Sequence, residues 1–377
     1  MFGTRPEAIK MAPVVAELGR HPGLIESRVC VTAQHREMLD QVLAVFGIIP
    51  DHDLDLMTEN QSPSGVTSSV LTALSALLQE VAPDVVLVHG DTTTTMAASL
   101  AAFYRKIPVA HVEAGLRTHN RYFPFPEEMN RVVTDSLTTF HFAPTHSARD
   151  NLLREGASPD SITVTGNTVI DALVDAAGRA GEPATPLPAR KRVVLVTAHR
   201  RENFGRPLEG ICTALAEVAK RFEDVVVVYP VHLNPNVQRT ARSILERQER
   251  VVLTDPLPYI EFVSLMKASY IVVTDSGGLQ EEAPALGKPV LVLRHETERP
   301  EAVEAGTVRV IGTEHDSVLA ECERLLSDDD AYRAMAEAVN PYGDGHAASR
   351  IVATLLARMV GGEHEMPREF TAGSARC

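Results

Sequence analysis

Short runs of β-branched and other apolar residues alternate with longer amphipathic stretches along nearly the whole chain of 377 residues. This alternation is the pattern of βα units around a parallel sheet. Eleven runs are expected to be strands: 28–32, 85–89, 109–112, 140–143, 162–165, 193–197, 225–229, 251–253, 271–274, 290–293 and 308–311. The chain is therefore expected to be an α/β protein.

The chain is longer than the size at which one hydrophobic core stops growing, so two domains are expected. A segment with three prolines, 179–191, breaks the βα pattern and is interpreted as a linker. It separates an N-terminal Rossmann-like domain, 1–178, from a C-terminal one, 192–345. An amphipathic stretch at 346–360 is expected to form a helix that completes the first domain, and the polar segment 361–377 is expected to be loose.

The composition and the net charge limit the classes of molecule that the protein can bind. Hydrophobic residues make up 44% and charged residues 23%, and no apolar run approaches the roughly 18 residues that cross a bilayer. With no signal-peptide pattern either, the protein is expected in the cytosol and away from membranes. The net charge of −14 disfavours a nucleic-acid partner. A small anionic substrate is still possible if a few cations or N–H groups make the electrostatic potential positive at the binding site.

Several cofactor patterns are missing from the sequence. Cys30, Cys212, Cys322 and Cys377 are far apart with no CxxC pair, which suggests neither a zinc site nor a disulfide framework. Neither G-x-G-x-x-G nor G-x-x-x-x-G-K-[ST] occurs, which weakens the case for nicotinamide chemistry and for P-loop phosphoryl transfer. No cofactor or metal is expected.

Ligands of open parallel sheets bind beyond the carboxyl ends of the strands, so residues just after strands are the candidates. In the first half these are Asp91, Glu113, and the pair Glu127 and Glu128 behind Pro126. Each has a plain alternative. Asp91 can cap the next helix, Glu113 can be merely solvated, and a helix start favours negative charge, which explains at least one of the two glutamates.

In the second half, His199 follows the first strand and His232 follows the second. The segment 274–282 is more informative, because a strand there leads through Gly277 and Gly278 into a helix. Glycines let backbone N–H groups approach a diphosphate, and Glu282 is placed to hold a ribose diol. The alternative is a plain tight turn.

Seven segments in series resemble the non-hydrolysing bacterial UDP-N-acetylglucosamine 2-epimerases. They are Gly3-Thr4-Arg5-Pro6-Glu7-Ala8-Ile9-Lys10, Thr32-Ala33-Gln34-His35-Arg36, His89-Gly90-Asp91-Thr92-Thr93, His111-Val112-Glu113-Ala114-Gly115, His199-Arg200-Arg201-Glu202, Asp275-Ser276-Gly277-Gly278 and Thr297-Glu298-Arg299-Pro300-Glu301. The resemblance covers 2–360 in the same order. It implies a GT-B architecture, in which two Rossmann-like doubly wound domains face a central cleft, and a homodimer.

The resemblance also implies roles for residues. Those that correspond to UDP-binding positions are Arg5, His232, Ser276, Gly277, Gly278 and Glu282. Those that correspond to the catalytic set are Asp91, Glu113, Glu127 and His199, with Lys10 close by. Those that match a second, allosteric site for UDP-N-acetylglucosamine are Gln34, His35, Glu37, Gln61 and Arg201.

The sequence departs from the family in two places. Family members have an apolar strand before the Gly-Thr-Arg-Pro turn, whereas this chain starts at Met1-Phe2-Gly3. Because that strand is central to the sheet, the natural protein is expected to be several residues longer, or its start to be misassigned. In addition, Arg294-His295-Glu296 stands where family members usually carry Arg-Asp-Thr, which leaves fine substrate preference open.

The implied reaction explains the residue types. The C2 hydrogen of the sugar is not α to a carbonyl, so one base cannot simply remove and return it. Loss of UDP from C1 together with the C2 proton gives a glycal, and UDP can then return as a proton arrives on the opposite face. Arg5 and the Ser276 turn suit the departing diphosphate, and the first-domain carboxylates suit the base and the acid. Which carboxylate is which stays open.

Three other functions remain open. A hydrolysing 2-epimerase would release N-acetylmannosamine and UDP, a GT-B glycosyltransferase would pass the sugar to an acceptor, and a sensor would bind the nucleotide sugar without turnover. The carboxylates of the first domain favour the epimerase, because neither a glycosyltransferase nor a sensor explains them.

Overall fold

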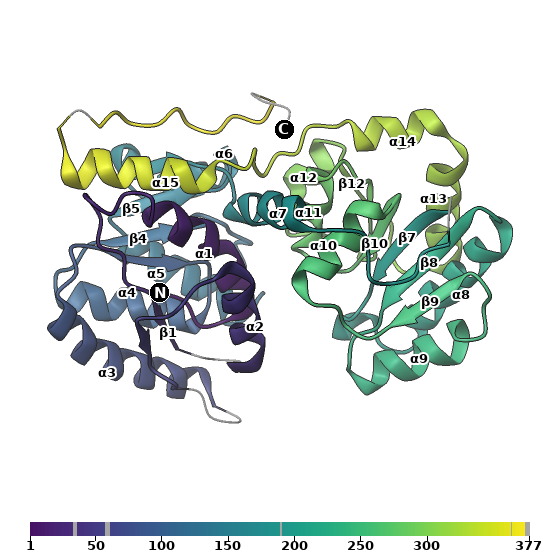
Figure 1. The fold of residues 1–377 in the computed structure, drawn as a ribbon, viewed down its shortest axis with the longest axis horizontal. Helices are drawn as coiled ribbons and strands as arrows, with labels where there is room; N and C mark the ends of the chain where they lie inside the picture. The colour runs from purple at the N-terminus through teal and green to yellow at the C-terminus, as the bar shows by residue number, and fades with distance from the viewer. Residues whose placement is uncertain (33–35, 57–60, 189–190, 363, 374–377) are drawn as a thin grey trace. The chain divides into compact units, whose positions relative to one another are not determined.

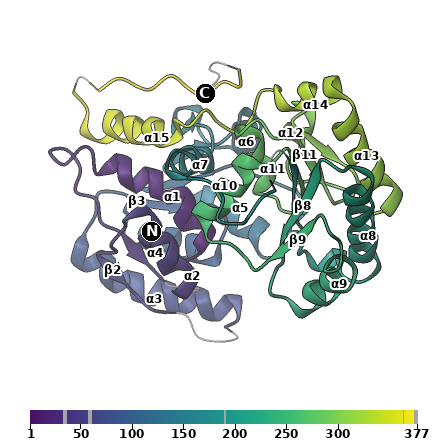
Figure 2. The ribbon, with the colours of Figure 1, turned by 45° about the vertical axis from the view of Figure 1, so that its right-hand side comes forward.

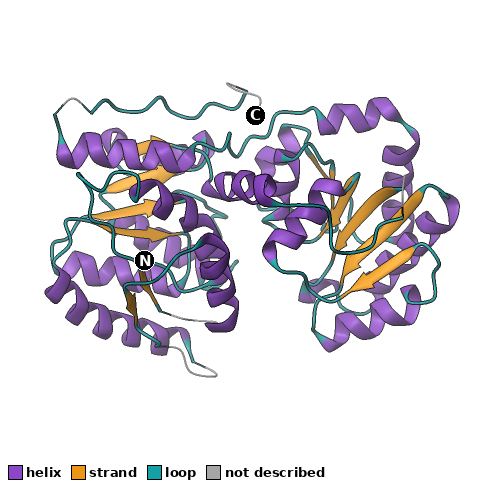
Figure 3. Cartoon of the chain, in the orientation of Figure 1, coloured by secondary structure: helices purple, strands orange, loops and turns teal. Residues whose placement is uncertain are grey.

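All eleven runs expected to be strands are strands in the computed structural model of the chain. The structure describes residues 1–32, 36–56, 61–188, 191–362 and 364–373. The chain divides into two compact units. Unit 1 comprises Met1–Ala172 and the described residues from Tyr342 onward, and unit 2 comprises Leu173–Pro341. Figure 3 shows that the strands of each unit gather in its own interior. The predicted α/β class with two Rossmann-like units is confirmed.

Unit 1 contains a four-stranded parallel sheet of order β3-β4-β5-β6 and a parallel pair, β1-β2. Met1 and Phe2 lie between them, because Phe2 bridges Val31 and the Met1 amino group donates to the Leu87 carbonyl at 2.9 Å. The strands are β1 (Cys30–Val31), β2 (His52–Asp53), β3 (Val86–His89), β4 (Val109–Val112), β5 (Phe140–Ala143) and β6 (Ile162–Val164).

Helices cover both faces of the unit 1 sheet (Figure 1). One core cluster joins α1, α2 and α15 to one face, and another joins α3 and α4 to the other. The helices are α1 (Arg5–Leu18), α2 (Arg36–Phe46), α3 (Pro63–Val81), α4 (Thr93–Tyr104), α5 (Glu127–Leu137), α6 (His146–Arg154) and α15 (Ala347–Leu355), which continues as a π-helical turn, Leu356–Val360. A further helix, α7 (Thr168–Arg179), begins in unit 1 and ends in unit 2.

Unit 2 contains a six-stranded parallel sheet of order β12-β11-β10-β7-β8-β9. This is the doubly wound order, which reverses direction between β7 and β10. The strands are β7 (Arg192–Thr197), β8 (Val225–Pro230), β9 (Val251–Thr254), β10 (Ile271–Thr274), β11 (Val290–Val292) and β12 (Val308–Val310).

Unit 2 also has helices on both faces of its sheet (Figure 2). A core cluster joins α8, α9 and α13 to alternate strand residues such as Val194 and Val196. The helices are α8 (Arg206–Arg221), α9 (Pro235–Leu245), α10 (Tyr259–Ala268), α11 (Leu279–Ala285), α12 (Pro300–Glu304), α13 (His315–Ser327) and α14 (Asp329–Ala336). Because both faces are covered, the central strands are apolar throughout rather than alternating.

The boundaries drawn from the sequence differ from the structure. The division falls between Ala172 and Leu173, inside α7, and not at residue 178. The proline-rich segment was expected to be a linker, but part of it contacts α10 of unit 2. From this segment, the Gly181 carbonyl accepts from the Ser264 hydroxyl at 2.6 Å, and just before it, in α7, the Ala177 carbonyl accepts from the Lys267 ammonium at 3.2 Å.

The segment after α15 also differs from the loose tail that its polarity suggested. It contains one aromatic residue, Phe370, whose side chain is buried in unit 1. The Phe370 N–H donates to the Val164 carbonyl at 2.8 Å, and the Arg350 guanidinium lies over its ring. One buried aromatic side chain and one backbone hydrogen bond therefore hold this segment against β6.

Candidate functional site

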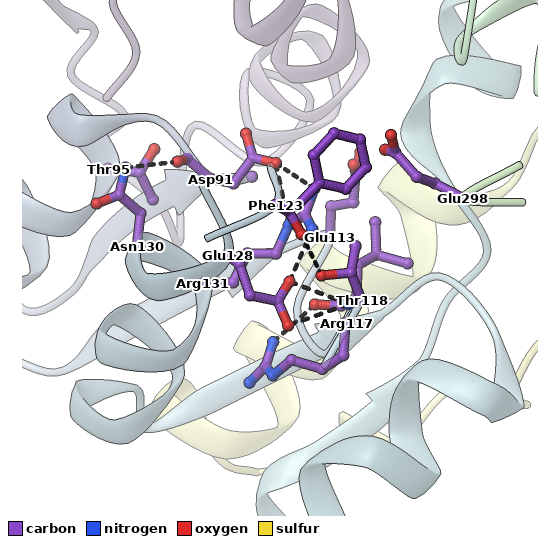
Figure 4. Close-up of polar contacts among 12 residues, drawn as sticks. Asp91, Thr95, Glu113, Arg117, Thr118, Phe123, Glu128, Asn130, Arg131 and Glu298 are labelled. Carbon is purple, nitrogen blue, oxygen red and sulfur yellow. Dashed lines mark hydrogen bonds and ion pairs between the residues drawn. The ribbon is translucent and has the colours of Figure 1, made fainter. Parts of the chain in front are cut away.

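The turn after β3 carries Asp91. Gly90 has a φ of +69°, and the Asp91 carboxylate accepts two hydrogen bonds from Arg131, at 3.0 Å from Nε and 2.5 Å from Nη2 (Figure 4). The sequence left open that Asp91 caps the next helix, but Thr92 is the N-cap of α4 and accepts from the Thr95 N–H at 3.1 Å. The Asp91 side chain is therefore an ion-paired carboxylate with about a third of its surface exposed, at 31%.

Glu113 follows β4, the neighbour of β3 in the sheet, and has a φ of +68°. A positive φ is costly for a residue with a side chain, so the surrounding contacts must hold this turn. The Glu113 carboxylate forms an ion pair with Lys10, lies 3.2 Å from His89 Nε2 and accepts from Asn167 Nδ2 at 3.4 Å. The merely solvated alternative is therefore excluded. Sequence reasoning missed His89 and Asn167 as Glu113 partners.

Glu127 and Glu128 differ completely, although they are adjacent in the first turn of α5. Glu128 is buried and accepts from the N–H groups of Thr118 at 3.0 Å and His119 at 2.8 Å, and from Arg131 at 3.2 Å (Figure 4). Glu127 is half-buried and forms no hydrogen bond or ion pair within the described part of the chain. Glu128 is thus the structural glutamate, and Glu127 keeps its carboxylate for another partner.

A buried hydrogen-bonded network of ionisable side chains stabilises the turns after β3 and β4. His111 on β4 lies 2.6 Å from the Asp135 carboxylate through Nδ1 and 2.8 Å from the Gly90 carbonyl through Nε2. Arg117 donates to the same carboxylate at 2.7 Å. Burial acts to raise the pKa of Asp135, but His111 and Arg117 outweigh it and lower that pKa to about 2. The network therefore holds the backbone beside Asp91.

The two predicted cations of unit 1 lie on α1. Arg5 begins the helix, and its guanidinium forms no ion pair or hydrogen bond with another described residue. Lys10 lies one and a half turns further along and is paired with Glu113. Of these two cations, Arg5 can therefore bind an anion without first losing a partner among the described residues.

In unit 2, the turns after β7 and β10 lie side by side at the point where the strand order reverses, because these two strands pair with each other. The fully buried Asp275 joins the turns. Its Oδ2 accepts from the N–H groups of His199 and Arg200, both at 2.8 Å, and from Asn203 Nδ2 at 3.0 Å. Its Oδ1 has no hydrogen-bond partner among the described residues but lies 3.3 Å from His199 Nδ1.

His199 and His232 stack, with their ring centroids 5.5 Å apart and their planes at 16°. Burial, then the His232 ring and the Arg200 guanidinium, lower the pKa of His199, while the Asp275 carboxylate acts in the opposite direction. His232 Nδ1 accepts from the Asn234 N–H at 3.1 Å, so the ring hydrogen of neutral His232 is on Nε2. The pair thus combines a ring whose pKa burial lowers with a ring that accepts at Nδ1.

Neither the backbone conformation nor the packing requires glycine at the two positions after β10. Neither Gly277 nor Gly278 has a positive φ, and Gly278 is helical, at φ −63° and ψ −38°. An added Cβ would meet only ordinary contacts, at 3.8 Å from Arg200 and 3.6 Å from Glu282. This pattern fits a turn whose backbone a ligand approaches closely. Nearby, Glu282 accepts from the Tyr259 hydroxyl at 3.4 Å, and the Ser276 N–H donates to the Thr274 hydroxyl at 2.9 Å.

The positions predicted to form a second site are only partly described. Gln34 and His35 lie outside the described residues, as does the side chain of Glu37. Gln61 donates to the Leu56 carbonyl at 3.1 Å, while its Oε1 is buried without a partner among the described residues. Arg201 is exposed on the short 3-10 turn Arg201–Asn203 of unit 2.

The segment that departs from the family pattern lies after β11. Arg294 is buried and donates to Glu202 at 3.1 Å, and it lies 3.6 Å from Glu298. The next residue, His295, is exposed and lies 3.9 Å from Glu314. Arg294 therefore links the segment after β11 to the turn that carries Glu202, which follows His199. The unusual residues after Arg294 are exposed.

Two further findings concern the described residues only. Among them, no group of three or more His, Cys, Asp or Glu side chains is arranged to hold a metal ion. Over the same residues, no helix combines the length and the apolar character that a membrane crossing requires. Cys30, Cys212 and Cys322 are buried free thiols, and Cys377 lies outside the described part.

Comparison with known proteins identifies relatives over nearly the whole chain. A family model described as UDP-N-acetylglucosamine 2-epimerase matches residues 16–356. The curated UDP-N-acetylglucosamine 2-epimerase of Escherichia coli K12 is 54% identical over 365 residues, which cover 94% of this chain and 97% of that protein. The Bacillus subtilis 168 enzyme of the same name is also 54% identical, over 98% of this chain and 97% of its own length.

Solved structures agree with these relatives. The UDP-GlcNAc 2-epimerase of Neisseria meningitidis, solved with UDP-GlcNAc bound, is 51% identical, covers 95% of this chain and 98% of its own, and has a TM-score of 0.88. The Methanocaldococcus jannaschii enzyme, in complex with UDP-GlcNAc and UDP, is 32% identical over 94% of this chain and 98% of its own, with a TM-score of 0.76.

Proposed function

The chain belongs to the UDP-N-acetylglucosamine 2-epimerase family, and on this premise we propose that it interconverts UDP-N-acetylglucosamine and UDP-N-acetylmannosamine. The observation that carries the proposal, beyond the family, is the pair of turns after β3 and β4. They present Asp91 and Glu113 from neighbouring strands, each held by a cation. These are the groups that proton transfer at a sugar carbon requires.

The proposed reaction balances without a redox partner. The C2–H bond breaks and its proton passes to a carboxylate, while its electron pair forms the C1=C2 double bond of a glycal. The C1–O bond breaks at the same time, and that electron pair leaves with UDP. Re-addition reverses these changes with the proton delivered to the opposite face of C2, so the net change is inversion.

Each described group has a place in this scheme. Glu113 and Asp91 are ion-paired and suit roles that begin with an ionised carboxylate, whereas the Glu127 carboxylate has no partner among the described residues and suits a role as acid. Arg5 and the N–H groups of the Gly277 turn suit the charge that develops on the diphosphate. Stacked His199 and His232 suit contact with the leaving group, and Glu282 suits the ribose hydroxyls.

On the strength of the family resemblance, we also propose a cytosolic homodimer whose substrate activates it at a second site. That site would include Gln34, His35, Glu37, Gln61 and Arg201. Light scattering tests the dimer. Initial rates with UDP-N-acetylmannosamine test the activation, which predicts a rise in rate on adding a trace of UDP-N-acetylglucosamine.

Incubation with UDP-N-acetylglucosamine in heavy water, followed by NMR, tests the main proposal. Deuterium at C2 of a sugar that still carries UDP is the expected result. Free N-acetylmannosamine and UDP as the only products would show a hydrolysing enzyme instead. Unlabelled substrate would end the proposal and leave a glycosyltransferase or a sensor.

A further inference from the structure

Glu7 is a buried carboxylate, 2% exposed, in the first turn of α1. Its Oε2 accepts from the N–H groups of Gly3 at 3.0 Å and Thr4 at 2.8 Å, and the Thr4 hydroxyl faces the Glu7 N–H in return. This exchange is a capping box, and it is enough to explain one oxygen of the carboxylate.

The other oxygen serves a different helix. Oε1 accepts from the Thr92 hydroxyl at 2.7 Å, and Thr92 is the N-cap of α4, directly after Asp91. The Thr95 hydroxyl lies 3.1 Å from the same oxygen, but its single hydrogen has a closer acceptor in the His89 carbonyl, at 2.6 Å. One carboxylate is therefore shared between the starts of α1 and α4, which capping alone does not require.

The two turns that Glu7 joins lie at the equivalent of the reversal point in unit 1. Met1 and Phe2 lie between β1 and β3, so the turn Gly3 to Arg5 and the turn Gly90 to Thr92 leave neighbouring positions of the sheet. Packing there leaves little room for adjustment, since a Cβ on Gly3 would lie 2.2 Å from the Thr32 hydroxyl oxygen.

We propose that Glu7 is a positioning residue for epimerisation, which fixes the Arg5 turn relative to the Asp91 turn. The inference rests on the proposed function. Under that function the Arg5 guanidinium attracts the departing diphosphate at C1 while Asp91 acts at C2 of the same ring. Glu7 then sets the geometry between the cation and the carboxylate without touching the substrate. Displacing catalytic groups by about 1 Å can cost about a hundredfold in rate.

Three single variants and one double variant test this role against a purely structural one. Glu7→Gln preserves volume and removes the charge, and Thr92→Ala removes the link on the α4 side together with the N-cap bond to the Thr95 N–H. Thr145→Ala is the matched control, because Thr145 caps α6 of the same unit through the same bond, from its hydroxyl to the Ala148 N–H at 3.1 Å. The double variant combines Glu7→Gln with Thr92→Ala.

The measurements are kcat, KM, the dissociation constant of UDP from calorimetry, and Tm. Both Glu7→Gln and Thr92→Ala are expected to lower kcat roughly 30-fold to 100-fold while the UDP dissociation constant stays within about threefold. Thr145→Ala is expected to lower Tm about as much as Thr92→Ala and to keep the wild-type kcat. The double variant is expected to be no slower than the slower single variant, because both break one connection.

The inference is overturned if Glu7→Gln keeps kcat within threefold of wild type, or if the two losses multiply in the double variant. It is also overturned if Thr145→Ala slows the enzyme as much as Thr92→Ala, since the loss would then follow stability alone. These results differ from failure of the proposed function, in which the wild-type protein itself would place no deuterium at C2.

Discussion

In each unit a buried carboxylate joins the two turns at the point where the strand order reverses, but the two carboxylates hold different sets of hydrogen-bond donors. In unit 1 both oxygens of Glu7 are occupied by N–H and O–H donors from two turns. In unit 2 one oxygen of Asp275 takes three donors, whereas the other lies 3.3 Å from a His199 ring nitrogen. Glu7 can therefore act only on backbone position, while Asp275 can also orient a ring that titrates.

The functional groups around the two carboxylates also differ in kind. Around Glu7 the functional side chains are ionic, and Asp91 and Glu113 each have a cationic partner. Around Asp275 the functional groups are imidazole rings and the backbone of a glycine turn. Under the proposed function, unit 1 supplies the charged groups, Arg5 among them, and unit 2 supplies imidazole and N–H groups to the leaving group. Three substitutions can break or sharpen this comparison.

The largest effect is expected for Glu113→Gln. The amide cannot accept a proton and cannot pair with Lys10, so kcat should fall by about 100-fold to 10,000-fold. Steady-state kinetics measures this. The control is Asp150→Asn, which removes an exposed carboxylate of α6. A loss below tenfold would remove Glu113 from the proton-transfer step.

A smaller effect is expected for Asp275→Asn. The amide oxygen can keep the backbone donors, but its NH₂ group would then face His199 Nδ1 and drive the ring hydrogen to Nε2. We expect activity to fall about 10-fold to 100-fold, which is the range known for partners that orient metal-bound histidines. Loss of the charge that raises the pKa of His199 should also lower that pKa further.

The pH profile distinguishes Asp275 from Glu7. Under the proposed role of His199, protonation of its ring lowers kcat/KM at acidic pH. This acidic limb should move to lower pH in Asp275→Asn, whereas Glu7→Gln should leave it in place. Asp255→Asn, on the exposed loop after β9 of unit 2, is the matched control. An unmoved limb in Asp275→Asn would mean that Asp275 is only a backbone anchor, as Glu7 is.

The smallest effect is expected for Gly278→Ala, which should raise the stability of the protein but lower its affinity for UDP. Because Gly278 is helical and has room for a Cβ, alanine should raise the free energy of unfolding by roughly 0.4–1 kcal/mol. The same Cβ should weaken UDP binding about tenfold by blocking close approach to the backbone. Gly181→Ala, at a position with open space, should stabilise similarly without changing UDP affinity. Unchanged affinity in Gly278→Ala would refute the role given to this turn.

The fold could be predicted well because its strands are covered on both faces. Runs such as Val225 to Tyr229 are buried throughout, so the apolar run itself marks the strand. The strand that was missed, β2, consists of the polar residues His52 and Asp53 at a sheet edge, where burial imposes no pattern. The tail was misjudged because one buried aromatic, Phe370, outweighs its polar neighbours.

The turns that carry the candidate site could also be predicted, since they follow strands. Their internal partners could not. Glu127 and Glu128 are equivalent in the sequence, and only the direction in which each leaves α5 separates them. The contact between Glu7 and Thr92 joins residues 85 positions apart, and the Asp275 contact with His199 joins residues 76 positions apart. No local spacing encodes such contacts.

The central claim is that UDP leaves C1 while the C2 proton is removed. Positional isotope exchange tests it directly, with UDP-N-acetylglucosamine that carries ¹⁸O in the bridge between C1 and the β-phosphorus. After partial turnover, ³¹P NMR of the recovered substrate should show part of the ¹⁸O in non-bridging β-phosphoryl positions. Epimer formed while all of the ¹⁸O stays in the bridge would contradict the account.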